Sequence, residues 1–149
     1  MPETATADAV IVRRVIDAPA EKIFRAWTDP AHIKNWFTPN EAVTMLSADV
    51  DAREGGSYRL TFVGPQRVPF SVTGVYRTVR PCSSLEFTWI WDDPDLAVGE
   101  TLVAVQLNPQ GGSTELTLTH TLLPTPEARE GHTQGWTAIL ESLAANVAG

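Results

Sequence analysis

The sequence predicts an α+β fold: a curved seven-stranded antiparallel sheet wraps around a long C-terminal helix, and two short helices follow the first strand. The hydrophobic pattern of the 149 residues changes from alternation to helical spacing after residue 17, back to alternation after residue 39, and to helical spacing again near residue 125. Short glycine and proline connections separate the alternating segments, which favours antiparallel pairing. Seven strands at about 4.8 Å spacing span about 30 Å, whereas one helix is about 10 to 12 Å wide, so the sheet must curl.

The first strand and the two short helices occupy the N-terminal quarter of the chain. Val10–Ile16 is a β-branched run and predicts the strand. Pro19 suits the first position of a helix, and Glu21 complements the helix dipole. Asp29 and Pro30 then suit the cap and first residue of a second helix. The apolar residues at helical spacing are Ile23, Phe24 and Trp27 in the first helix and Ile33, Trp36 and Phe37 in the second.

Six further strands are predicted between residues 43 and 122. They are Val43–Val50, Ser57–Val63, Phe70–Val79, Ser84–Trp91, Thr101–Leu107 and Thr114–Leu122. The pair Gly55 and Gly56 marks one turn, and Pro-Gln-Gly-Gly at 109–112 predicts a hairpin connection between the last two strands.

The C-terminal helix is predicted to begin at Pro126, with Thr125 as its cap. Its apolar stripe consists of Trp136, Ile139, Leu140, Leu143, Ala144 and Val147. Gly135 interrupts this helix and costs about 1 kcal/mol relative to alanine. Either the backbone approaches a neighbouring aromatic closely there, or the gap is kept open for a ligand beside Trp136.

Strand alternation sends large side chains toward the concave face of the sheet. These side chains are Tyr58, Leu60 and Phe62; Phe70, Val72 and Tyr76; Leu85, Phe87, Trp89 and Trp91; and Leu116, Leu118, His120 and Leu122. Two interpretations are compatible: the aromatic residues fill the core, or several of them line an apolar pocket with a few polar groups, which is the usual anatomy of a small-molecule site.

Composition excludes several classes of function. The net charge is −7 and the 11 basic residues are scattered, so no nucleic-acid partner is expected. No apolar run approaches the ~20 residues needed to cross a bilayer, and residues 1–9 read as a disordered polar tail without a signal peptide. With Cys82 as the single cysteine, a reducing, cytoplasmic location is expected. Residues 10–147 are predicted to form one domain.

The polar residues form no complete catalytic constellation, so no catalytic residue, metal or cofactor is predicted. The acids around the loop, Asp92, Asp93, Asp95 and Glu100, do not match an EF-hand register, and the histidines lack the spacing of a zinc site. Cys82 is expected to be a turn residue. His120 is interpreted as a hydrogen-bonded core histidine, with a ligand anchor and a general base as alternatives.

Several motifs, in their order along the chain, resemble those of the activator of heat-shock-protein ATPase homologue-like family. They are Ala-Pro-Ala-Glu at 18–21, Trp-Thr-Asp-Pro at 27–30, Trp36-Phe37, Arg-Glu-Gly-Gly at 53–56, Gly74, Leu-Thr-Leu-Thr-His at 116–120 and Gly-Trp-Thr-Ala-Ile-Leu-Glu-Ser-Leu at 135–143. That family belongs to the START-like, birch-pollen-allergen-like (SRPBCC) superfamily. The resemblance covers about residues 10 to 147 and implies a helix-grip fold with a hydrophobic cavity between sheet and C-terminal helix. Bacterial stand-alone members are similar to binding modules.

The first functional hypothesis is a binding protein that encloses a small hydrophobic or aromatic molecule. The residues predicted to line it are Trp27, Trp36, Phe37, Tyr58, Phe62, Phe70, Tyr76, Trp89, His120, Trp136 and Leu140. The alternatives are a hydrolase-like or cyclase-like enzyme of the same fold, acting through His120 or Glu86, and a module that stimulates a chaperone ATPase through its acidic surface. An exposed strand or aromatic edge could also support a homodimer.

Overall fold

The structure is a computed structural model and describes residues 9–37, 43–64, 69–92 and 98–147. Its elements, in chain order, are β1 (Val10–Ile16), α2 (Ala20–Thr28), α3 (Pro30–Trp36), β2 (Thr44–Val50), β3 (Ser57–Val63), β4 (Phe70–Arg80), β5 (Ser84–Trp91), β6 (Thr101–Gln110), β7 (Ser113–Thr121) and α4 (Pro126–Val147). Residues 1–8 of the predicted tail, and Asp93 and Asp95 of the acidic loop, lie outside the described residues.

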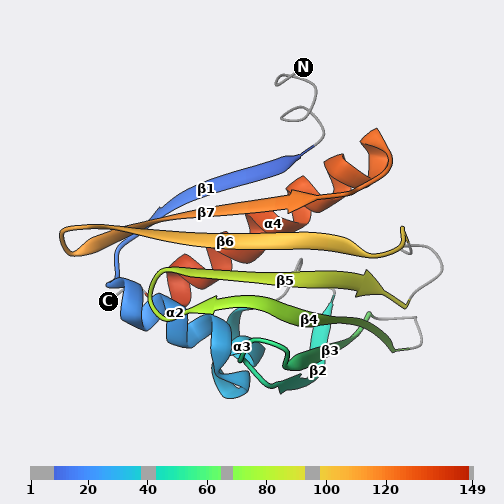
Figure 1. Cartoon of the computed structure of the whole chain (residues 1–149), viewed down its shortest axis with the longest axis horizontal. Helices are drawn as coiled ribbons and strands as arrows, with labels where there is room; N and C mark the ends of the chain where they lie inside the picture. The colour runs from blue at the N-terminus through green and yellow to red at the C-terminus, as the bar shows by residue number, and fades with distance from the viewer. Residues whose placement is uncertain (1–8, 38–42, 65–68, 93–97, 148–149) are drawn as a thin grey trace.

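The strands form one seven-stranded sheet in the order β1-β7-β6-β5-β4-β3-β2, with every neighbouring pair antiparallel. Figure 1 shows α4 lying behind the curved sheet, with α2 and α3 toward its β2 side. Helix α3 packs on β2, α2 and α4, so the two short helices join the long helix to one edge of the sheet. The predicted α+β fold, with a curved sheet around the C-terminal helix, is confirmed.

Two of the three predicted helix starts are confirmed. The Asp29 carboxylate accepts a hydrogen bond from the Ala31 N–H at 2.9 Å, and the Thr125 hydroxyl accepts one from the Ala128 N–H at 3.1 Å. Pro19 differs from the prediction. Its backbone is extended (φ −71°, ψ 154°), so it precedes the first turn of α2, and its carbonyl accepts the N–H groups of residues 22 and 23.

The β6–β7 hairpin is tighter than predicted. Gln110 pairs with Ser113, so Pro109 and Gln110 belong to β6 and only Gly111 and Gly112 form the turn. Gly111 has φ +73°, a left-handed conformation that glycine adopts without steric cost.

The strand alternation predicted for the concave face matches the burial of β3 and β7, in which every second residue is buried. The inward-facing position predicted for Leu122 is wrong: β7 ends at Thr121, and Leu122 has φ 71° and is 66% exposed. The register of β4 against β5 shifts between Tyr76 and Thr78, a few residues after Gly74. An added Cβ at Gly74 would lie 1.9 Å from the Thr88 carbonyl oxygen and 2.6 Å from the Tyr58 ring. The Tyr58 hydroxyl donates to that same oxygen at 2.5 Å, so a glycine is required for the ring to pass β4 and reach β5.

The prediction of a close backbone approach at Gly135 is wrong. A Cβ built on this residue meets no atom within 4 Å, because this part of α4 borders open space. The helix therefore carries the intrinsic cost of glycine without a packing contact that requires it.

Candidate functional site

A small apolar cavity lies between the short helices and the sheet. Trp27 of α2 and Ile33 and Phe37 of the α3 region form one wall. The opposite wall consists of Val50, Tyr58, Leu60, Tyr76, Phe87 and Trp89 from strands β2 to β5. The volume is about 20 Å³, which is room for about one water molecule. Ligand sites for small organic molecules are usually about 300 to 1,000 Å³, so this cavity is much smaller than a typical ligand site.

The side chains around the cavity form a connected aromatic shell. Phe37 lies at its centre, with ring centroids 6.2 Å from Trp27, 6.1 Å from Trp89 and 5.7 Å from Trp136. Phe87 lies 6.4 Å from both Trp27 and Trp89. These separations are typical of interacting aromatic pairs, so the shell joins the helical wall to the sheet wall.

Five of the predicted ligand-binding residues border this cavity: Trp27, Phe37, Tyr58, Tyr76 and Trp89. The other six are buried around it. Trp36 packs against Trp27, with centroids 4.9 Å apart, and Phe62 stacks on Phe70 at 5.7 Å. Trp136, Leu140 and His120 lie in the core between α4 and the sheet.

His120 is fully buried and both of its ring nitrogens are engaged. The Trp136 indole N–H donates to Nδ1 at 3.0 Å, so this nitrogen is unprotonated and Nε2 carries the hydrogen. Nε2 then donates to the Thr101 hydroxyl at 2.7 Å, and that hydroxyl donates to the Trp89 carbonyl at 2.9 Å. These bonds are those of a histidine whose hydrogen-bonding groups are all used within the protein.

His132 extends this network to the side of α4. Its ring lies 4.9 Å from that of His120. Its Nδ1 donates to the Ala128 carbonyl at 2.8 Å, and its Nε2 accepts from the Trp91 indole at 3.1 Å. Both histidines are therefore neutral, with opposite nitrogens protonated.

Burial determines the protonation of this network. Desolvation, followed by the neighbouring His132, lowers the pKa of His120 to about 3. Desolvation also lowers the pKa of His132, although its hydrogen bond to the Ala128 carbonyl acts in the opposite direction. At neutral pH the Nδ1 lone pair of His120 is occupied by an indole, so the geometry does not support a general base.

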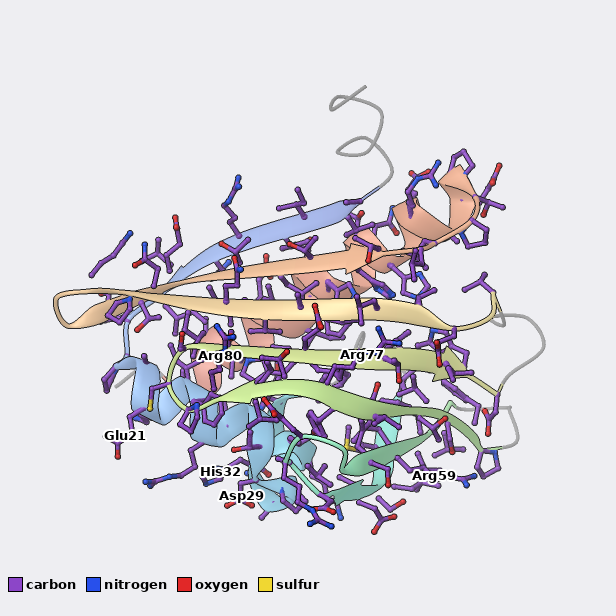
Figure 2. All side chains as sticks on the ribbon, viewed as in Figure 1. Glu21, Asp29, His32, Arg59, Arg77 and Arg80 are labelled. Carbon is purple, nitrogen blue, oxygen red and sulfur yellow. The ribbon has the colours of Figure 1, made fainter. Side chains whose placement is uncertain are left out.

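The described residues that line the cavity include no charged side chain. Burial raises the pKa of the Tyr58 phenol, and the neighbouring Tyr76 adds to this shift. Burial also raises the pKa of Tyr76, with a smaller contribution from Asp51. The polar and charged side chains labelled in Figure 2 lie on the outside of the molecule, namely Glu21, Asp29 and His32 on the helices and Arg59, Arg77 and Arg80 on the sheet.

A second hollow lies on the outer face of the sheet. It measures about 400 Å³ and is open to solvent. Its exposed lining is polar and charged, and includes Asp49, Arg59 and Glu100 beside Val75. Tyr58 borders this outer hollow as well as the cavity.

The loop residues weighed as chemical candidates have structural contacts. Asp92 accepts a hydrogen bond from the Ser71 N–H at 2.6 Å and lies 4.0 Å from the Arg59 guanidinium. Glu100 lies 3.9 Å from Arg77. Cys82 occupies the β4–β5 turn with φ 62°.

Sequence reasoning did not include Ile33, Val50, Leu60 and Phe87 in the lining. Leu60 and Phe87 were recoverable, since alternation already placed both on the concave face. Val50 ends an edge strand, and its position in the lining depends on how far β2 extends beneath the helices. Thr101 and His132 are the polar neighbours of His120. Strand pairing and helix packing bring them close to it, so the sequence pattern does not reveal these contacts.

No helix in the described part of the chain combines the length and apolar character needed to cross a bilayer. The family described as Activator of Hsp90 ATPase homolog 1-like protein matches residues 17–148, which is most of the chain. The chain belongs to this family. The resemblance drawn from the sequence motifs is therefore confirmed. No curated protein matches the chain.

Solved structures of similar proteins share the architecture of this member of the Activator of Hsp90 ATPase homolog 1-like family. A protein from Chromobacterium violaceum is 27% identical, with a TM-score of 0.87 over 96% of this chain and 99% of that one. The AHSA1 protein from Silicibacter pomeroyi is 29% identical, with a TM-score of 0.80 over 92% and 95% of the two chains. A protein from Rhodobacter sphaeroides is 27% identical, with a TM-score of 0.80 over 93% and 91%.

Proposed function

We propose that the protein binds a small hydrophobic or aromatic molecule in the cavity between its sheet and its helices. The observation that carries the proposal is that apolar, mainly aromatic side chains from α2, the α3 region and four strands converge on one cavity. Folds of this family commonly bind hydrophobic ligands. An apolar lining contributes affinity through the area that it removes from water.

A ligand of several carbon atoms requires the cavity to widen. The helical wall is the part suited to move, because α2 and α3 contain nine and seven residues. Helices shorter than about 12 to 15 residues are marginal on their own and are held by packing. Moving α2 and α3 outward carries Trp27, Ile33 and Phe37 away from the sheet and leaves the strand wall in place.

An enzyme acting through His120 has less support. Its ring nitrogens are bonded to Trp136 and Thr101, and desolvation keeps it neutral. Glu86, the other acid considered, lies on the strand between the inward-facing Leu85 and Phe87 and is half-buried. Binding without chemistry therefore accounts better for this interior.

The test is a titration with the neutral fluorophore N-phenyl-1-naphthylamine, followed by its emission and by native mass spectrometry. We expect saturable binding of one molecule per chain. Val50→Phe, which fills the cavity from its edge, should weaken this binding at least about tenfold, whereas Val75→Phe should leave it unchanged. Val75 is a matched control because it is 44% exposed on the outer face of β4.

Two results would overturn the proposal. One is the absence of saturable binding to the folded wild-type protein. The other is equal loss of binding in the two phenylalanine variants, which would place the probe on the outer face.

A further inference from the structure

We propose that the ligand carries a neutral hydrogen-bond acceptor, such as a carbonyl oxygen, and that the indole N–H groups of Trp27 and Trp89 recognise it. This inference rests on the proposed function, since it specifies the chemical class of the molecule enclosed. The donors come from opposite walls, Trp27 from the helical wall and Trp89 from β5.

The inference rests on which of the five tryptophans have a hydrogen-bond partner for the indole N–H. Three indole N–H groups are hydrogen-bonded: Trp36 to the Ala26 carbonyl at 3.0 Å, Trp91 to His132 at 3.1 Å and Trp136 to His120 at 3.0 Å. The other two, on Trp27 and Trp89, are buried and have no partner within the described part of the chain.

The two unpaired donors belong to the two tryptophans that border the cavity. Trp27 and Trp89 are only 4% and 3% exposed, so bulk water does not satisfy them. A buried donor without a partner is unfavourable, and the great majority of such groups in proteins are paired. Two of them beside one cavity indicate that an acceptor belongs there when the site is filled.

The lining also defines the charge of the acceptor. Among the described residues no cationic side chain borders the cavity, so a carboxylate or phosphate would lose its hydration without a counter-charge. A carbonyl, ether or phenol oxygen needs only N–H donors. The shell around the donors is aromatic, with Phe37 and Phe87 each about 6 Å from both indoles. The ligand class is therefore a neutral, mainly apolar molecule with at least one acceptor oxygen.

The test compares two probes of similar size, indane and 1-indanone, which differ by one carbonyl group. Isothermal titration calorimetry gives the ratio of the indane Kd to the 1-indanone Kd for each protein. This ratio should fall about tenfold in Trp27→Phe or Trp89→Phe relative to wild type, because each variant removes a donor and keeps an aromatic ring. Trp36→Phe is the matched control, since its N–H is already bonded, and should leave the ratio unchanged.

A measurement on the wild-type protein covers the case in which a variant fails to fold. In ¹H–¹⁵N spectra, the indole proton resonances of Trp27 and Trp89 should move downfield with 1-indanone and not with indane. The other three indole resonances should stay in place, because their protons are already donated.

The outcomes separate the inference from the proposed function. If both probes bind but the affinity ratio and the two indole resonances do not respond to the carbonyl, the inference is wrong and the binding function stands. The same result is expected if one water molecule stays in the cavity and accepts hydrogen bonds from both indoles. If neither probe binds to the folded protein, the proposed function fails and the inference fails with it.

Discussion

Acidification from pH 7 to pH 5 should destabilise the protein through His120. The unfolded chain takes up a proton at this histidine near its ordinary pKa of 6.5, whereas the folded protein does so only near 3. Between these values the unfolded state binds more protons, so the free energy of unfolding falls as the pH falls. The contribution of neutral His120 to the free energy of unfolding is fully present above pH 6.5 and decreases progressively toward pH 3.

The magnitude follows from the two pKa values. Between pH 7 and pH 5, protonation of His120 stabilises the unfolded state by about 2 kcal/mol and hardly stabilises the folded state. The physical cause is local. A proton on Nδ1 would face the Trp136 N–H, and the buried ring has no acid beside it in the network that the structure describes.

The assay is urea unfolding at pH 7 and pH 5 for wild type and His120→Asn. The asparagine oxygen can accept from Trp136 in place of Nδ1, but the variant cannot titrate. We expect the variant to be less stable at pH 7, and its deficit to shrink by about 2 kcal/mol at pH 5. Titrating groups far from His120 are common to both proteins, so their effects cancel in the difference.

A stability difference that is the same at both pH values would refute this reasoning. So would an NMR titration in which the His120 Cε1 proton shifts with a midpoint above pH 5 while the protein stays folded. Either result would mean that the buried ring accepts a proton at little cost.

Two glycine substitutions should have opposite effects. Gly135→Ala should raise the free energy of unfolding by about 1 kcal/mol, because alanine favours the helix over glycine by this amount and its Cβ meets only open space. An unchanged urea midpoint would show that this turn of α4 is not regular helix in solution. Gly74→Ala should lower the free energy of unfolding by about 2 to 3 kcal/mol, because its Cβ would collide with the Thr88 carbonyl and the Tyr58 ring. Val75→Ala on the same strand is the control and should cost less. Equal urea midpoints for the two variants would contradict the close packing at Gly74.

The order of elements could be predicted from the sequence because each depends on local chemistry. Asp29 and Thr125 cap helices through bonds to residues two or three positions away, and a sequence pattern records this spacing directly. The curl of the sheet follows from its width, which needs only the number of strands. The start of α2 was predicted less well, because Pro19 is equally compatible with the first helical position and with the extended residue before it.

The size of the cavity could not be predicted in the same way. The width of the sheet requires space beside α4, but among the described residues large side chains reduce the cavity below the short helices to about 20 Å³. The volume that remains depends on side-chain rotamers and on ring contacts of about 6 Å among the aromatic side chains around it. Alternation assigns a side chain to a face of the sheet, but not to the cavity wall or the layer behind it.

The pairing of the tryptophans lies between these two cases, and part of it can be read from the sequence. The Ala26 carbonyl would normally accept the N–H of residue 30, four positions along, but that residue is Pro30 and has no N–H. The carbonyl is therefore left for another donor, and Trp36 of the next helix supplies one. Trp27, one position after Ala26, points its ring toward the sheet, where its indole finds no acceptor in the described structure. The proline that begins α3 thus leaves a carbonyl free for the indole of Trp36, and the indole donor of the helical wall that has no partner in the described structure is that of Trp27, beside the cavity.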